Sequence, residues 1–355
     1  MGNATSTDWK TIRAEYPGLA QGTYVDTSSM GLMARSTEEA GRREAKSLME
    51  EGSARFIHWM MQGRADVTAR VAAHFGGSKE GTALLQSFTV GMSRLAPLLR
   101  HRKKVLLVGG DYPTLHGPFR WNGFEVVLLE PDPDGTLPMD RLAAMVERER
   151  PGIVAISHVQ WTTGFTIDLD ALHELCKAHD AWSLVDATQS WCCAPIDLRE
   201  TPIDILGASG YKWPLAGAGN GFFHLAGHVR EEVRERTGHD AVKVLGEGHV
   251  DPAALVRLDD AVQRATDLGM QAVATRVRGI TDLAVERLDR ANVKLLNGRD
   301  PAHRAGILMI EGDDKRLDRM RQAGVQAQLR GAGIRIGLHF YNNEGDVERL
   351  VESCG

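Results

Sequence analysis

Cysteine is scarce in this chain of 355 residues, which contains only Cys176, Cys192, Cys193 and Cys354. These positions do not have the paired spacing of a zinc site, and adjacent cysteines rarely form a disulfide with each other. Disulfide frameworks belong mainly to secreted proteins, whereas unpaired cysteines are typical of reducing compartments. We therefore expect a cytoplasmic protein without disulfides and without a metal site.

Long hydrophobic runs and an excess of one charge are also missing. No apolar stretch approaches the roughly 18 residues that a membrane-spanning helix needs. The polar start, MGNATSTDWKTIRAEY, lacks the apolar core of a signal peptide. The net charge of -5 gives no electrostatic basis for binding nucleic acid or an anionic membrane surface. We expect neither as a partner.

What the sequence does contain is an alternation of strand-like and helix-like segments. Short apolar runs are separated by segments with helical periodicity, such as 139–149 and 169–179, and a long helix is expected over 37–73. This alternation is typical of a mostly parallel sheet that helices cover on both faces, so we predict an α/β fold. The predicted strands span residues 105–108, 126–129, 153–157, 182–185, 205–208 and 221–225.

The pattern changes after Leu245–Asp251 (LGEGHVD), a glycine-rich polar stretch that is typical of a domain boundary. A helical block over 252–288 precedes an α+β tail with strands near 306–310 and 333–338. We predict a large domain over residues 21–249, a small α+β domain over 250–355, and an N-terminal segment over 1–20 that packs with the small domain.

Lys212 is the most unusual residue. It stands in ASGYKWPLAGAGNGF, a stretch that begins at Ala208 and contains no other charge. Such a lysine could extend its ammonium group to solvent from a loop. Alternatively, it lies where ligands bind, at the carboxyl ends of the strands, with a lowered pKa that makes its amine a better nucleophile. The stretch alone leaves both interpretations open.

Asp186 ends a predicted strand in SLVDATQS, residues 183–190. Its carboxylate could merely cap a helix, or it could face the same crevice as Lys212. A pyridinium cofactor bound as a Schiff base needs a lysine for its aldehyde and an anion that keeps its ring nitrogen protonated. The two residues together meet that need.

Four segments in order resemble the class V aminotransferase and cysteine-desulfurase family of pyridoxal-phosphate (PLP) enzymes, fold type I. They are SHVQWTTG at 157–164, VDATQS at 185–190, ASGYKW at 208–213 and RIGLHFYNNEGDVERL at 335–350. The resemblance covers nearly the whole chain. It implies a mostly parallel seven-stranded sheet in the large domain, a PLP cofactor, an amino-acid substrate, and a homodimer with sites at the subunit interface.

The resemblance also implies the cofactor contacts. Lys212 would form the Schiff base, Asp186 would pair with the pyridine nitrogen, and Gln189 would hydrogen-bond the phenolic oxygen. Tyr112, in the segment DYPT, would stack on the ring, although a proline turn explains that segment equally well. Near a strand-to-helix junction, where a plain N-cap is equally compatible, and in the lysine loop, the phosphate contacts would be Ser87, Phe88, Thr89, Ser209 and Tyr211.

Two positions depart from the family pattern. Trp161 stands where relatives often have asparagine near the ring oxygen, which puts one hydrogen bond to the cofactor in doubt. His249 stands where a threonine is common, in the stretch that reaches the phosphate of the neighbouring subunit in relatives. It could donate a hydrogen bond there, or it could be a solvated loop residue.

The tail carries the implied substrate contacts. Arg335 matches the carboxylate-binding arginine of the family, whose planar fork suits bidentate capture of an α-carboxylate. A surface ion pair is the alternative for this residue. Arg330 could bind a second acidic group or lie in solvent, and Ser29 belongs to a loop that lines the substrate side in relatives.

The segment GVQAQLRGAGIR, residues 324–335, contains no cysteine. Cysteine desulfurases carry a mobile cysteine shortly before the arginine, where it accepts sulfur as a persulfide, so such a relay is disfavoured here. The remaining chemistry needs an α-amino acid bound to PLP as an external aldimine, and Lys212 as the base that removes its α-proton. We expect an aminotransferase, with a β-eliminating C–S lyase and an amino-acid epimerase as alternatives.

Overall fold

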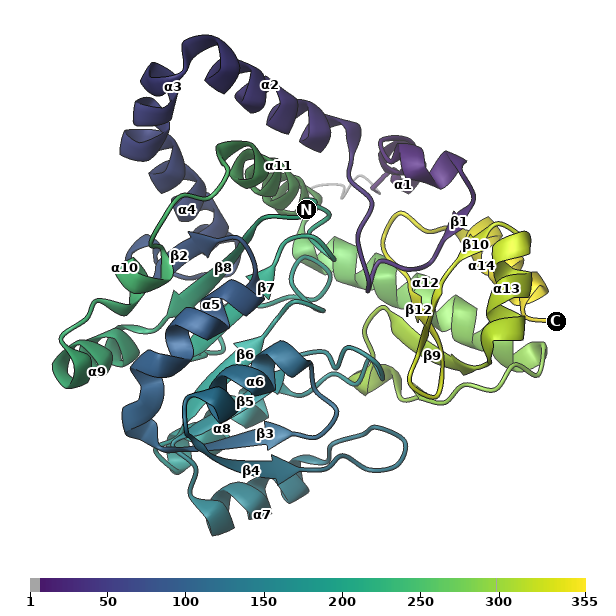
Figure 1. Cartoon of the computed structure of the whole chain (residues 1–355). Coiled ribbons are helices and arrows are strands. Elements are labelled where there is room, and N and C mark those ends of the chain that lie inside the picture. Colours follow the sequence, from purple (N-terminus) through teal and green to yellow (C-terminus); the bar gives the residue numbers. More distant parts are fainter. Residues whose placement is uncertain (1–6, 298) are drawn as a thin grey trace, which may run out of the picture.

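The computed structural model describes residues 7–297 and 299–355, which form two α/β units around a larger and a smaller sheet (Figure 1). The larger sheet has seven strands in the order β2-β8-β7-β6-β5-β3-β4. β8 is antiparallel to both neighbours and all other pairs are parallel, which confirms the predicted fold. The strands are β2 (Thr82–Leu85), β3 (Lys104–Val108), β4 (Glu125–Leu129), β5 (Ile153–Ser157), β6 (Trp182–Asp186), β7 (Ile205–Ser209) and β8 (Gly221–Leu225).

Helices cover both faces of this sheet because successive strand residues point into two separate apolar clusters. Leu106 lies in one cluster and Leu107 in the other. The central strands β5, β6 and β7 are buried along their whole length, which explains their mostly apolar sequences. One face packs against α4 (Arg64–His74), α7 (Met139–Glu149), α8 (Leu169–Ala178) and α11 (Pro252–Leu268), and the other against α5 (Phe88–Leu95), α6 (Pro113–Trp121), α9 (Gly227–Thr237) and α10 (Ala241–Leu245).

The single helix expected over residues 37–73 is interrupted. α2 (Arg35–Glu51) ends at Gly52, whose φ of 56° lies in a region that glycine adopts without the penalty of a Cβ atom. α3 (Ser53–His58) and a π-helical turn (Trp59–Gly63) connect it to α4. α2 and α3 form an arm at the top of Figure 1.

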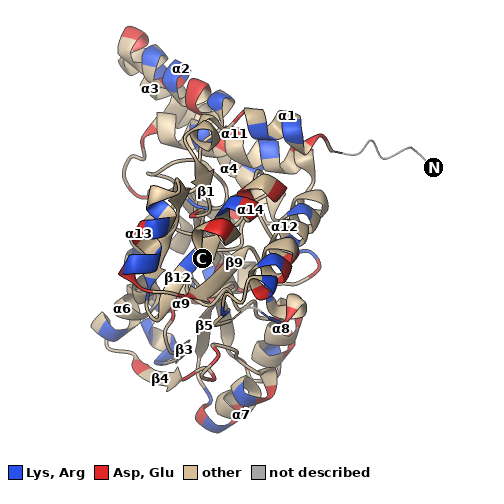
Figure 2. Ribbon diagram, turned by 90° about the vertical axis from the view of Figure 1, so that its right-hand side faces the viewer, with Lys and Arg blue, Asp and Glu red and all other residues tan. Residues whose placement is uncertain are grey.

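The smaller unit has a three-stranded antiparallel sheet in the order β11-β12-β9. Three helices share one apolar cluster with it, and acidic and basic residues are interspersed along the helices of both units, as α7 and α12 show (Figure 2). No helix in the described ranges is long and apolar enough to cross a membrane. The elements are β9 (Ile307–Glu311), β11 (Gln328–Arg330), β12 (Gly333–Gly337), α12 (Met270–Arg290), α13 (Asp314–Gln322), α14 (Glu344–Ser353) and the short parallel pair β1 (Thr23–Tyr24) and β10 (Val325–Gln326).

α11 packs with the larger unit, although the predicted division of the chain falls just before it. The helix lies against α2 and α4, and its residues Leu255 and Leu258 belong to an apolar cluster of the larger sheet. Helical periodicity shows that residues 252–268 form a helix but not which sheet the helix covers. Packing therefore favours a boundary near Gly269, and the division into domains remains a prediction.

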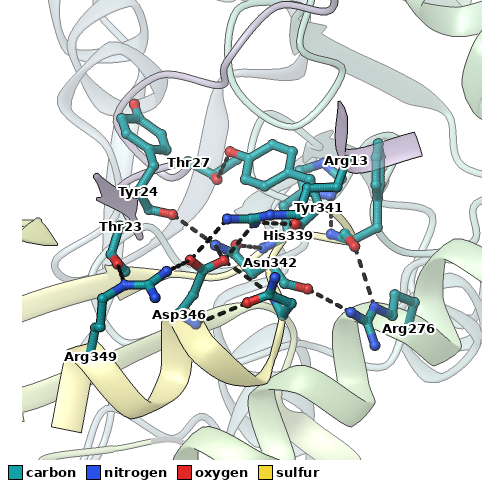
Figure 3. A network of polar contacts seen from close by, with 12 residues as sticks. Arg13, Thr23, Tyr24, Thr27, Arg276, His339, Tyr341, Asn342, Asp346 and Arg349 are labelled. Carbon is teal, nitrogen blue, oxygen red and sulfur yellow. Dashed lines mark hydrogen bonds and ion pairs between the residues drawn. The ribbon is translucent and has the colours of Figure 1, made fainter. Parts of the chain in front are cut away.

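A buried carboxylate connects the N-terminal segment to the smaller unit (Figure 3). Asp346, in the first turn of α14, is fully buried and accepts two hydrogen bonds from Arg13 at 2.6 and 3.1 Å. Arg349 donates to the same carboxylate at 2.8 Å, and Asn342 donates at 3.2 Å. Because Arg13 belongs to α1 (Trp9–Ala14), the described part of the predicted segment 1–20 contacts the smaller unit; residues 1–6 lie outside the described residues.

We predict that Asp346→Ala lowers the free energy of unfolding by about 3 kcal/mol, because it leaves the half-buried Arg13 without its anion. Urea denaturation followed by circular dichroism measures this change. As a control, Glu50→Ala removes an exposed i,i+4 pair with Lys46 and should change the free energy of unfolding by less than about 0.5 kcal/mol. Equal effects of the two substitutions would contradict a stabilising role for this network.

Candidate active site

Asp186 and Lys212 meet at the carboxyl edge of the large sheet. Asp186 is the last residue of β6, and Lys212 follows shortly after the neighbouring parallel strand β7. The two residues are only 4% and 5% exposed. An acid and an amine therefore share one water-poor pocket.

Burial disfavours the charged form of each of these groups. It raises the pKa of Asp186 to about 6, against the opposing effects of Thr188, whose backbone N–H donates at 2.8 Å, and of Lys212. Burial lowers the pKa of Lys212 to about 8, against the attraction of Asp186 and with the help of two arginines, Arg335 and Arg330. An amine with this pKa can act as a nucleophile or a base near neutral pH.

The orientation of the Gln189 amide is fixed by Trp213. The indole Nε1 of Trp213 donates to Gln189 Oε1 at 2.6 Å, and Gln189 Nε2 donates to the backbone oxygen of Ser28 at 3.1 Å. The bond to Ser28 uses one of the two N–H groups of Nε2, so the side chain can donate its remaining N–H to a ligand. Gln189 is thus arranged as a hydrogen-bond donor.

The junction of β2 and α5 supplies hydroxyl and backbone N–H groups. Ser87 caps α5 by accepting from Val90 N at 3.3 Å, and Ser209 at the end of β7 accepts from Phe88 N at 2.9 Å. Thr89 lies in the first turn of the helix. A helix N-terminus with such groups favours an anion, and a phosphate in particular.

Two aromatic side chains form a wall opposite Lys212. Tyr112 and Trp161 pack edge to face with their ring centroids 5.4 Å apart, and Lys212 Nζ lies 5.3 Å from the centre of the Tyr112 ring. The indole N–H of Trp161 donates to the carbonyl oxygen of Gly110 at 2.9 Å. Trp161 therefore offers a ligand its ring surface, not the hydrogen bond of the asparagine that relatives often have there.

These groups surround a cavity of about 150 Å³. Its amine, buried carboxylate, amide donor and helix N-terminus are the groups that the aldehyde, ring nitrogen, phenolic oxygen and phosphate of PLP require, so the donor set fits this cofactor. All predicted cofactor residues except His249 line the cavity: Ser87, Phe88, Thr89, Tyr112, Asp186, Gln189, Ser209, Tyr211 and Lys212.

A second cavity, of about 380 Å³, adjoins the first and is also lined by Lys212. It contains all the predicted substrate residues, Arg335, Arg330 and Ser29. Arg335 is buried and donates to the backbone oxygen of Trp161 at 2.8 Å and to Ser29 Oγ at 2.6 Å. Burial lowers its pKa to about 10, which leaves the guanidinium charged at neutral pH.

His249 lies outside both cavities. Its ring is exposed and packs edge to face on Phe56 of α3 at 5.0 Å, and its backbone oxygen accepts from Gln86 at 3.3 Å. Within one chain it does not reach the cofactor residues. Contact with the phosphate of a neighbouring subunit stays a prediction.

Asp111 is a buried carboxylate beside the site, outside the lining of both cavities, to which the sequence analysis gives no role. It accepts hydrogen bonds from the backbone N and the hydroxyl of Ser157 at 2.9 and 2.6 Å, and its charge helps to raise the pKa of Asp186. Asp111 follows β3 as Asp186 ends β6, so the same strand-end argument could have identified it.

The family models and the curated relatives that match this chain are consistent with one another. Residues 118–350 match the family Aminotransferase class-V, and residues 16–189 match Aminotransferase class I and II. The chain is 27% identical to isopenicillin N epimerase of Streptomyces clavuligerus, over 80% of this chain and 81% of the epimerase. It is 34% identical to cysteine desulfurase IscS of Shewanella sp. (strain ANA-3), but that match spans 50% of this chain and only 40% of the desulfurase.

Solved structures share the fold at low sequence identity. The cysteine desulfurase of Thermococcus onnurineus NA1 has a TM-score of 0.88 at 16% identity, covering 99% of this chain and 98% of that one. The cystine C–S lyase C-DES, solved with its product cysteine persulfide, has a TM-score of 0.85 at 17% identity, covering 96% of this chain and 98% of that one.

We predict that the cofactor-free protein takes up PLP faster as the pH rises through about 8, because only the neutral amine of Lys212 attacks an aldehyde. Below that pH the ammonium form dominates, and above it the rate should level off. Stopped-flow absorbance measures the rate, and Lys212→Ala serves as the control without covalent uptake. A midpoint near the value of a free lysine, about 10.4, would contradict a buried amine.

Proposed function

The chain belongs to the aminotransferase class-V family of PLP-dependent enzymes, and from this premise we propose that it transfers the amino group of an α-amino acid. The observation that carries the proposal is the pair of cavities that share Lys212, one fitted to PLP and the other containing Arg335. Such an arrangement presents the α-carbon of a bound amino acid to the lysine amine.

The cofactor supplies the electron-withdrawing ring and the carbonyl carbon that accepts the amino group. Asp186 would hold the ring nitrogen, and its charged form is favoured once a protonated nitrogen replaces part of its lost hydration. Gln189 would donate to the phenolic oxygen through its free N–H. Ser87, Thr89 and Ser209 would hold the phosphate at the start of α5.

Lys212 is proposed as the acid and base of the reaction. With a pKa of about 8, its amine accepts the α-proton near neutral pH, and the resulting ammonium group can return a proton to the acceptor carbon. The wall of Tyr112 and Trp161 restricts water on the side of the cavity that they cover. A single amine on one face of the bound amino acid is enough to remove the α-proton and to return a proton to the acceptor carbon.

Arg335 is proposed to bind the α-carboxylate. Its Nε is buried without a hydrogen-bond partner among the described residues, and its two bonds to Trp161 and Ser29 fix the plane of the guanidinium. A carboxylate would satisfy the free N–H groups with charge-assisted hydrogen bonds. This contact fixes the amino acid relative to Lys212.

Chemistry that needs no thiol is favoured by the positions of the cysteines. Cys176, Cys192, Cys193 and Cys354 are all buried and none lines either cavity. A persulfide relay would require one of them to reach the substrate. Amino-group transfer requires only the cofactor, Lys212 and Arg335.

We also propose a cytoplasmic homodimer, in which His249 reaches the site of the partner. The exposed ring of His249 packs on the α2–α3 arm, which carries the exposed apolar side chains Met49 (77%) and Ile57 (60%), and Met61 (77%) is exposed on the π-helical turn that follows. Apolar side chains gathered on a projecting arm are typical of a surface that another chain covers. Light scattering during size-exclusion chromatography would measure the mass of the assembly.

We predict that Arg335→Gln lowers kcat/KM by roughly thirtyfold or more, because truncating one partner of a buried charge pair costs about 2 kcal/mol or more. The absorbance of bound PLP should stay unchanged, since Arg335 does not line the cofactor cavity. Arg321→Gln, on the exposed face of α13, is the matched control. A loss of cofactor absorbance in Arg335→Gln would assign the arginine to the cofactor instead.

The reaction itself is tested by product analysis of the PLP-loaded protein with single amino acids. Amino-group transfer predicts one equivalent of keto acid and a cofactor in its amine form, with absorbance moving from about 420 to about 330 nm. Pyruvate with a released thiol or sulfide would mean β-elimination, and loss of optical activity without other products would mean epimerisation. Lys212→Ala should form none of these products.

A further inference from the structure

Cationic side chains line the second cavity, the substrate cavity. Arg330 and Arg335 contribute two guanidinium groups beside Lys212, whereas no aspartate or glutamate of the described chain lines it. Asp26 lies 3.8 Å from Arg335 but outside this lining, and burial raises its pKa against the opposing effects of Ser29, Arg335 and Arg330. The α-carboxylate of one amino acid can pair with one of the two guanidinium groups, which leaves the other without a ligand partner in the cavity.

Arg330 has no carboxylate within ion-pair distance in the part of the chain that the structure describes, although its charge acts on the buried Asp26. Its guanidinium donates one hydrogen bond, to the backbone oxygen of the preceding Leu329 at 3.1 Å, and the residue is half-buried. Among other partly buried arginines, Arg13 and Arg102 pair with carboxylates, whereas Arg64 and Arg276 each donate to two or more backbone oxygens. A desolvated guanidinium that faces a cavity without a carboxylate is arranged to receive one from a ligand.

The strand register places Arg330 and Arg335 on one face of the same hairpin. Gln328 of β11 pairs with Arg335 of β12, and Arg330 pairs with Gly333. Side chains two residues apart on a strand, and residues directly opposite each other, share a face of the sheet. The two arginines are therefore diagonal neighbours, with Cβ atoms roughly 7 Å apart, and both reach the cavity.

We propose that the substrate is an α-amino acid whose side chain carries a second acidic group, and that Arg330 binds this group. The inference rests on the proposed function, because it assigns the α-carboxylate to Arg335. An amino acid with a neutral side chain would leave Arg330 without an anion inside the cavity. A second carboxylate or sulfinate would occupy its planar fork while Arg335 binds the α-carboxylate.

The test compares acidic amino acids with their amides. PLP-loaded full-length protein is titrated with L-aspartate, L-glutamate and L-cysteine sulfinate, and with L-asparagine and L-glutamine, while the cofactor absorbance reports binding. We expect at least one acid to bind about tenfold or more tightly than its amide, the range of a charge-assisted hydrogen bond. Comparing the affinity for L-cysteine sulfinate with that for L-aspartate and L-glutamate shows whether Arg330 prefers a sulfinate or a carboxylate.

Arg330→Gln should weaken the binding of the acids about tenfold or more relative to the binding of the amides, so that the preference is lost. Arg330→Lys should retain part of the preference, because it keeps the charge and loses the fork. Arg319→Gln, exposed on α13 of the same unit, is the matched control and should behave as the unaltered protein.

Three results would overturn the assignment. Equal binding of acids and amides by the unaltered protein would exclude a second acidic group. If Arg330→Gln lowered the affinity for acids and amides by the same factor, Arg330 would bind the α-carboxylate together with Arg335. If the cofactor absorbance responded to no amino acid, the proposed function would be wrong as well. The first two results, in contrast, would exclude only the role of Arg330.

Discussion

Asp186 and Lys212 are held together in one water-poor pocket, and much of the surrounding structure compensates for burying their charges. Thr188 donates to Asp186, and the opposite charges of Asp186 and Lys212 favour the ionised form of each other. These interactions only partly offset burial, so the pKa of Asp186 remains raised and that of Lys212 lowered. The same incomplete compensation makes the acid responsive to a cationic ring nitrogen and the amine reactive.

The loop after β1 connects the two halves of the site. Ser28 accepts a hydrogen bond from Gln189 in the cofactor cavity, and Ser29 accepts one from Arg335 in the substrate cavity. Strand β1, which precedes this loop, is tied to the Asp346 network, because Asn342 donates to the backbone oxygen of Tyr24 at 2.9 Å (Figure 3). The ion pairs of the smaller unit thus help to position the loop whose residues Ser28 and Ser29 line the second cavity.

Much of this arrangement could be predicted from sequence, and the exceptions have physical causes. Alternating apolar strands and helices predict the parallel sheet, and a lysine and an aspartate at strand exits predict where ligands bind. The role of Trp213 could not be predicted, because its hydrogen bond to Gln189 depends on how the lysine loop folds back over β6. α11 was assigned to the smaller unit because periodicity does not reveal which sheet a helix covers. Whether His249 contacts the phosphate of a neighbouring subunit depends on how two chains pack together, which a single sequence does not describe.

The central claim is that Lys212 is the residue that binds PLP covalently. Borohydride reduction of the PLP-loaded protein, followed by proteolysis and mass spectrometry, identifies the modified lysine directly. We predict stoichiometric pyridoxyl modification of the peptide that contains Lys212, and none in Lys212→Ala. Modification of a different lysine, or equal modification of the Lys212→Ala protein, would contradict it.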